Sequence, residues 1–118
     1  MKMLRIMCKS KIHRATVMTT RIDYEGSITI DGELLRQTDI LPGEKVAVYN
    51  LNNGLRFETY VIEGPINSGE VCINGAAARM AQKDDKIIIV SYVLVTEEEA
   101  KTWQPIILMV DNNNKPVK

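Results

Sequence analysis

The stretch Tyr24-Glu25-Gly26-Ser27-Ile28-Thr29-Ile30 is the segment around which the rest of the chain is organised. Polar and apolar side chains alternate from Asp23 onward, which predicts a half-buried strand with Ser27 on its polar face. A Gly-Ser pair alone is typical of a bulge or a tight bend at a strand entry. The Gly26–Ser27 peptide bond becomes a candidate reaction site only through the segments around it.

Short strands separated by turns account for most of the remaining sequence. The pair Asn53-Gly54 favours a type I′ hairpin turn, and Leu41-Pro42-Gly43-Glu44 has the composition of a turn. Strand patterns cover residues 3–14, 45–50, 55–62, 70–73, 86–95 and 106–110, and residues 15–20 continue extended.

Only short helices are expected between these strands. They cover residues 33–38, a segment that Asn74 would cap, and a turn after the capping box Thr96-Glu97-Glu98-Glu99. The polar tail, residues 111–118, is expected to fray. So many short strands predict a mainly β protein with a barrel or related architecture, because an open sheet would leave exposed edges.

Composition narrows the class of protein further. The chain has 118 residues, which predicts one domain, and its 45% hydrophobic content with only 5% aromatics predicts an aliphatic core. Lys+Arg and Asp+Glu are both 15, so the net charge of 0 argues against a nucleic-acid partner. No apolar run approaches a membrane span and no signal-peptide core is visible, so we expect no membrane association and a cytoplasmic location.

Metal chemistry is not expected. Cys8 and Cys72 are far apart and lack the paired spacing of a zinc or redox motif, so both are interpreted as free thiols. His13 is the only histidine, which makes a histidine-based metal cage improbable.

Two further segments carry residue types suited to an acidic ligand. Arg56 and Tyr60 share one face of a strand about 13 Å apart, and an Arg fork with a Tyr hydroxyl can bind a carboxylate and donate a proton. Backbone N–H groups at residues 75–77 would form an anion site or oxyanion donors at a helix start. Each feature also has an ordinary structural interpretation, as an exposed Arg, a half-buried Tyr or a helix cap.

Taken together, four segments resemble the pyruvoyl-dependent aspartate decarboxylase family in order and spacing. They are Lys11-Ile12-His13-Arg14, Tyr24 to Ile30, Asn53-Gly54-Leu55-Arg56-Phe57-Glu58-Thr59-Tyr60, and Asn74-Gly75-Ala76-Ala77-Ala78. The resemblance covers nearly the whole chain up to the tail. It implies a double-psi β-barrel, residues 1–118 as one domain, assembled as a homotetramer with active sites between neighbouring subunits.

The resemblance also implies that the chain cleaves itself. Ser27 Oγ would attack the Gly26 carbonyl, giving a β chain of residues 1–26 and an α chain of residues 27–118 that begins with a covalent pyruvoyl cofactor. Gly26 has no Cβ to obstruct the attack and tolerates backbone strain. Thr59 is implied to bond the Gly26 carbonyl oxygen. Because alternation puts Thr59 opposite Arg56 and Tyr60, we expect a bulge or a break in that alternation.

The implied activity is the decarboxylation of L-aspartate to β-alanine for pantothenate biosynthesis. The pyruvoyl group at position 27 would form a Schiff base with the substrate amine and accept the electrons released with CO2. Tyr60 is the implied proton donor. The residues implied to hold the substrate or the pyruvoyl group are Lys11, His13, Arg56, Thr59, Asn74, Gly75, Ala76 and Ala77. The resemblance leaves open whether a maturation partner assists the cleavage.

Two other functions remain as alternatives on the residues alone. One is a non-enzymatic small β-barrel that binds a partner, which would leave the chain uncut. The other is a serine hydrolase using Ser27 and His13, although no nucleophile-elbow motif surrounds Ser27.

Overall fold

The computed structural model describes residues 2–117 and is mainly β, as predicted. Its strands are β1 (Leu4–Thr16), β2 (Thr19–Arg21), β3 (Ser27–Asp31), β4 (Lys45–Asn50), β5 (Arg56–Gly64), β6 (Val71–Asn74), β7 (Lys86–Thr96) and β8 (Ile106–Met109). Its helices are short: α1 (Gly32–Thr38), the 3-10 helix η1 (Gly75–Arg79) and α2 (Glu97–Ala100). Within residues 2–117, no helix has the length and apolar character needed to cross a membrane.

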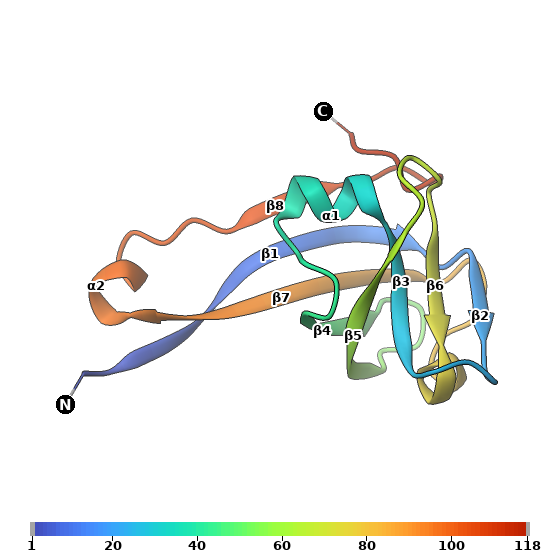
Figure 1. Cartoon of the computed structure of the whole chain (residues 1–118), viewed down its shortest axis with the longest axis horizontal. Coiled ribbons are helices and arrows are strands. Elements are labelled where there is room, and N and C mark those ends of the chain that lie inside the picture. Colours follow the sequence, from blue (N-terminus) through green and yellow to red (C-terminus); the bar gives the residue numbers. More distant parts are fainter. Residues whose placement is uncertain (1, 118) are drawn as a thin grey trace.

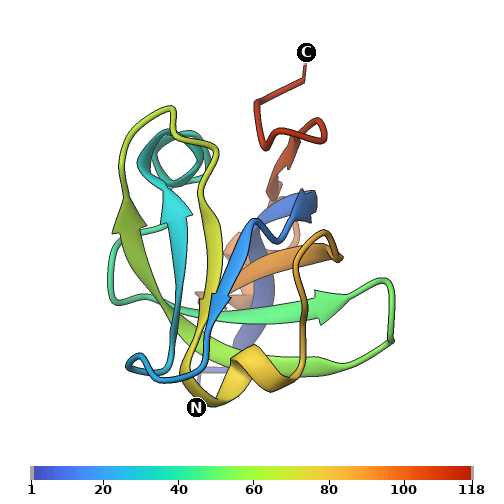
Figure 2. The same ribbon diagram turned by 90° about the vertical axis from the view of Figure 1, so that its right-hand side faces the viewer.

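The strands form one eight-stranded sheet in the order β2-β6-β3-β5-β4-β7-β1-β8. Strands β1, β7 and β8 run along the long axis of the molecule, and β2, β3, β5 and β6 cross them in a compact body (Figure 1). The view in Figure 2 shows how the sheet curls within that body. Among the described residues no pairing joins the edge strands β2 and β8, so closure into a double-psi barrel stays a prediction.

Aliphatic side chains fill the core, as the composition predicts. The largest fully buried ones are Ile12, Ile28, Ile30, Leu34, Ile73, Ile87, Ile89, Val17, Val46, Val48, Val61 and Val71. Burying each such side chain contributes about 1.5–3 kcal/mol. Because side chains alternate along a strand, inward-facing Ile28 and Ile30 turn Ser27 and Thr29 to the opposite face of β3.

The strand expected from Asp23 onward begins later in the structure. The Tyr24 N–H donates to the Arg21 carbonyl at 3.3 Å in a turn, and β3 starts only at Ser27. The expected start was wrong because Asp23 and Glu25 pair with no neighbouring strand in the described part of the chain, although polar and apolar side chains do alternate there. The Gly26–Ser27 bond therefore lies where a loop enters a strand.

The Asn53-Gly54 pair does not form the expected type I′ turn. Gly54 has φ +76°, but Asn53 is not among the residues with positive φ. Asn53 Oδ1 instead accepts the Leu55 N–H at 2.9 Å, and the Asn50 N–H bonds the Leu55 carbonyl at 2.9 Å across a longer loop. This side-chain bond turns the backbone without a left-handed residue at position 53.

The C-terminal tail is anchored, so the expectation that it frays was wrong for residues 111–117; residue 118 lies outside the described residues. Asn114 is fully buried, and its Nδ2 donates to the carbonyls of Thr16 at 2.9 Å and Gly69 at 2.8 Å. Its Oδ1 accepts the Thr16 N–H at 2.7 Å.

The capping box predicted before the last helix is confirmed, because Thr96 and Glu99 form the capping box of α2.

Candidate active site

Ser27 is buried at the first position of β3, immediately after the Gly26–Ser27 bond. Its Oγ donates to the Glu25 carbonyl at 3.0 Å and accepts a hydrogen bond from Asn74 Nδ2 at 3.0 Å. The antiparallel pairing of β3 with β6 sets Ser27 directly opposite Asn74. Two hydrogen bonds thus fix the hydroxyl beside the backbone of the Gly26–Ser27 junction.

The side chain of Asn74 does not cap a helix, contrary to the sequence-based expectation. Asn74 precedes η1, but it makes no side-chain cap bond. Its Nδ2 donates to both Ser27 Oγ and Thr29 Oγ1 at 3.0 Å, since strand pairing turns the amide toward β3. Ala76 and Ala77 follow within η1, and their role as anion donors stays a prediction.

Cys72 and Thr29 complete this cluster and were not among the predicted site residues. Cys72 Sγ donates to Asn74 Oδ1 at 3.2 Å, and Cys72 is paired with Thr29 across the β3–β6 ladder. Period two along a strand could have identified both, because each lies two residues from a predicted site residue, Asn74 or Ser27. Their partnership depends on the β3–β6 register, which the sequence does not reveal.

Gly75 packs against the backbone that would be cleaved. Its φ is +71°, and a Cβ built there would lie 2.5 Å from Gly26 Cα, 2.7 Å from Gly26 N and 2.9 Å from the Tyr24 carbonyl oxygen. By contrast, a Cβ on Gly26 would meet nothing within 4 Å. Position 75 therefore needs glycine both for its backbone conformation and for this close approach.

Tyr60 and Thr59 lie on β5, the strand that pairs in parallel with β3 from Ile28 onward. The ladder begins with Ile28 paired to Val61, so Ser27, the first residue of β3, and Tyr60 each lie one residue before it, whereas Gly26 lies in the loop that precedes the strand. The β4–β5 ladder is continuous through Thr59, so the expected bulge is absent and alternation holds. Tyr60 thus lies on the side of the sheet that carries Ser27, and Thr59 lies on the core-facing side with Val61.

Arg56 lies at the other end of β5, on the same face as Tyr60. Its guanidinium is 4.5 Å from the centroid of the Tyr49 ring, and the Tyr49 and Tyr92 hydroxyls are 2.8 Å apart. The hydrogen bond with Tyr49, followed by burial, raises the pKa of Tyr92 to about 12. Tyr49 therefore supports Arg56 through a cation–π contact, and Tyr92 holds the Tyr49 hydroxyl.

Lys11 and His13 lie on β1, which β5, β4 and β7 separate from β3 in the sheet. No hydrogen bond among residues 2–117 joins either side chain to Ser27, so the contact needed by a serine hydrolase is not made. His13 Nδ1 is buried without a partner. Burial, followed by the charges of Lys11 and Arg14, lowers the pKa of His13.

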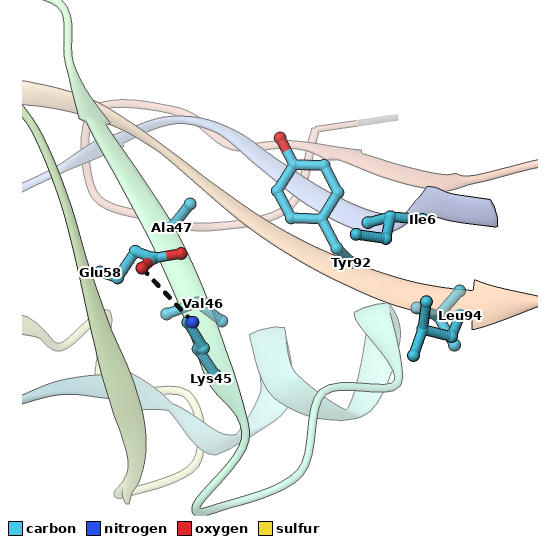
Figure 3. Close-up of a pocket in the computed structure, with 8 residues that line it drawn as sticks. Ile6, Lys45, Val46, Ala47, Glu58, Tyr92 and Leu94 are labelled. Carbon is cyan, nitrogen blue, oxygen red and sulfur yellow. Dashed lines mark ion pairs between the residues drawn. The ribbon is translucent and has the colours of Figure 1, made fainter. Parts of the chain in front are cut away.

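A separate apolar groove runs between β4 and β7 (Figure 3). An ion pair between Lys45 of β4 and Glu58 of β5, 3.3 Å long, lies on the β4 side of the groove (Figure 3). The residues that line the groove are Ile6, Lys45, Val46, Ala47, Glu58, Tyr92, Val93 and Leu94. None of these is a predicted site residue. Within residues 2–117, no group of three or more His, Cys, Asp or Glu side chains is placed to hold a metal ion.

Comparison with known proteins gives a consistent result over nearly the whole chain. Residues 3–117 match the family described as aspartate decarboxylase. The chain is 58% identical over 115 residues to the aspartate 1-decarboxylase of Thermoanaerobacter pseudethanolicus, covering 98% of each protein. It is 57% identical over 116 residues to that of Pelotomaculum thermopropionicum, covering 98% of this chain and 88% of the relative. It is 59% identical over 116 residues to the aspartate 1-decarboxylase of Caldicellulosiruptor saccharolyticus, covering 98% of this chain and 91% of the relative.

Proposed function

The chain belongs to the aspartate decarboxylase family, and from that premise we propose that it makes β-alanine and CO2 from L-aspartate with a pyruvoyl group derived from its own Ser27. The β-alanine would serve pantothenate biosynthesis. One observation carries the proposal: a buried hydroxyl is held by two hydrogen bonds immediately after Gly26, against which Gly75 packs without a Cβ.

The surroundings of Ser27 suit formation of such a group from the chain itself. In the first step Ser27 Oγ attacks the Gly26 carbonyl carbon, the C–N bond breaks, and the hydroxyl proton passes to the released nitrogen, leaving an ester. Loss of the Ser27 Cα proton then breaks the Cβ–Oγ bond. Oγ departs in the carboxylate of fragment 1–26, and residue 27 becomes dehydroalanine. Addition of one water and loss of one ammonia complete the pyruvoyl end of fragment 27–118.

Asn74 and Thr59 carry groups suited to assist this cleavage. Asn74 Nδ2 donates to Oγ, and a donor there stabilises the negative charge that develops as the proton leaves. Thr59 lies on β5 two residues before the part of that strand that pairs with β3, and we propose that its hydroxyl donates a hydrogen bond to the Gly26 carbonyl oxygen. No bulge is needed for this approach, because it comes from the neighbouring strand.

In the decarboxylation, the pyruvoyl group supplies a ketone for the substrate amine and an electron sink for the breaking bond. Tyr60, level with residue 27 and on the same side of the sheet, is proposed to donate the proton that replaces CO2 at the substrate Cα. Arg56, with Lys11 and His13, would bind the substrate carboxylates. Asn74, Gly75, Ala76 and Ala77 would position the reacting end.

A homotetramer with active sites between subunits is the assembly that we propose. Lys11 and His13 are four ladder steps from β3 within one chain, so a neighbouring copy offers a way to complete the site. Large apolar side chains along β1 and β7 are exposed, including Ile6 at 71% and Leu94 at 61%. Exposed apolar surface of this kind marks association surfaces. Sedimentation equilibrium tests the assembly, and a monomer at micromolar concentration would contradict it.

Intact-protein mass spectrometry tests the proposed maturation. We expect two species that separate after Gly26, the larger with a pyruvoyl end that reacts with hydrazines, and production of β-alanine from L-aspartate in a chromatographic assay. Ser27→Ala should leave one uncut, inactive chain. Ser68→Ala is the matched control, because Ser68 Oγ also donates to a nearby backbone carbonyl, that of Pro65, at 2.6 Å. Decarboxylation by Ser27→Ala, or a wild-type chain that stays uncut, would overturn the proposal.

A further inference from the structure

The Cys72 thiol is buried next to the cleavage junction, and the chemistry described above does not use it. Cys72 is 1% exposed, and its Sγ lies 3.2 Å from Asn74 Oδ1. Thr29 Oγ1 accepts one Nδ2 hydrogen of the same amide at 3.0 Å, and Ser27 Oγ accepts from Nδ2 at the same distance. Three neighbours therefore engage the Asn74 amide, and Ser27 is the only one of them in the proposed reaction.

The orientation of this amide decides what faces Ser27. A half-turn about the last side-chain bond of Asn74 exchanges the positions of Oδ1 and Nδ2. The hydroxyls of Ser27 and Thr29 can form hydrogen bonds in both orientations, because a hydroxyl is both a donor and an acceptor. In the observed arrangement an N–H group points at Ser27 Oγ, and the Ser27 proton goes to the Glu25 carbonyl. In the reversed arrangement an oxygen would face Oγ, which disfavours the negative charge that develops during attack.

We propose that Cys72 is a positioning residue for self-cleavage, whose thiol holds the Asn74 amide with Nδ2 toward Ser27 Oγ, and that Thr29 anchors the same amide on its other side. This inference rests on the proposed cleavage between Gly26 and Ser27. The thiol donates to Oδ1 from one side, and Thr29 accepts the second Nδ2 hydrogen from the other. Without the thiol, Asn74 Oδ1 would be buried without a donor, so the observed orientation would lose the contact that favours it over the reversed one.

The test measures the rate at which freshly purified precursor is converted to the two fragments, by intact mass against time. Cys72→Val keeps the size and apolar character of the side chain but removes the donor, and Cys72→Ser keeps a donor. We expect Cys72→Val to cleave about tenfold more slowly, the equivalent of about 1.4 kcal/mol, and Cys72→Ser to remain within about threefold of wild type. Cys8→Ala is the control for loss of a thiol elsewhere, since Cys8 Sγ donates to the Ser10 carbonyl at 3.9 Å on β1 and not to the Asn74 amide.

Thr29→Val and Thr29→Ser repeat the comparison at the other anchor, so the inference stays testable if a Cys72 variant does not fold. Thermal unfolding of each variant identifies those that are folded. Wild-type cleavage rates in folded Cys72→Val and Thr29→Val would overturn the inference, as would a Cys72→Ser rate as slow as that of Cys72→Val. A wild-type chain that never cleaves would instead overturn the proposed function, so the two failures are distinguishable.

Discussion

Adding one methyl group at Gly75 should slow self-cleavage strongly. The Cβ of Gly75→Ala would lie 2.5 Å from Gly26 Cα, whereas carbon atoms in contact are about 3.5 Å apart, so the segment before Ser27 must move by about 1 Å. A displacement of that size at a reacting centre costs about 100-fold in rate. The positive φ of +71° adds about 1–2 kcal/mol of backbone strain for an L residue.

Gly54→Ala separates the two effects. Gly54 has a similar φ of +76°, but a Cβ there would meet nothing within 4 Å. Both variants should therefore lose about 1–2 kcal/mol of stability in urea unfolding through strain. Only Gly75→Ala should also accumulate uncut precursor when conversion to fragments 1–26 and 27–118 is followed by intact mass.

The reasoning at Gly75 is refuted if folded Gly75→Ala matures at the wild-type rate, since the Gly26 backbone would then not depend on this approach. It is equally refuted if Gly54→Ala slows cleavage as much as Gly75→Ala does. Backbone strain alone would then account for the effect, and contact with the cleavage junction would not be needed.

Other predictions concern turnover, pH and the tail. Tyr60→Phe should cleave normally but decarboxylate at least about tenfold more slowly; an unchanged kcat would remove Tyr60 as the proton donor. The pKa of His13 is lower in the folded chain than in the unfolded chain, so as pH falls the unfolded chain takes up this proton at a higher pH. The stability of the folded chain should therefore fall as pH drops below about 6.5, and it should fall less in His13→Gln. Identical wild-type melting curves at pH 7 and pH 5 would contradict this. Tyr49→Phe should bring the Tyr92 pKa from about 12 toward 10 in an ultraviolet titration, and an unchanged Tyr92 titration would rule out the hydroxyl pair as the cause. Wild-type stability should also fall as pH rises from about 10 toward 12, because the unfolded chain loses the Tyr92 proton at a lower pH than the folded chain. Asn114→Ala should cost about 2 kcal/mol or more in urea unfolding, because buried backbone groups lose their partners, and a loss under about 0.5 kcal/mol would show a tail that contributes little.

Local sequence patterns were sufficient to predict secondary structure wherever the conformation of a residue depends on its neighbours along the chain. The mainly β class, the strand Lys45–Asn50 and the capping box at Thr96 follow from alternation and capping chemistry, and the structure confirms them. The alternation of β5 also holds, with Val61 in the core and Arg56 exposed. The Asn53-Gly54 turn was predicted wrongly because the Asn53 side chain bonds the backbone in a way that dipeptide preferences do not capture.

The sequence alone therefore determined which segments are strands and which residue types could carry the chemistry, because side-chain periodicity is a local property of the backbone. Only the tertiary structure decided which of those residues meet. Asn74 reaches Ser27 across 47 residues, and Gly75 contacts Gly26, through the register of β3 against β6. Register between distant strands is set by the packing of the whole core, and no single segment contains that information.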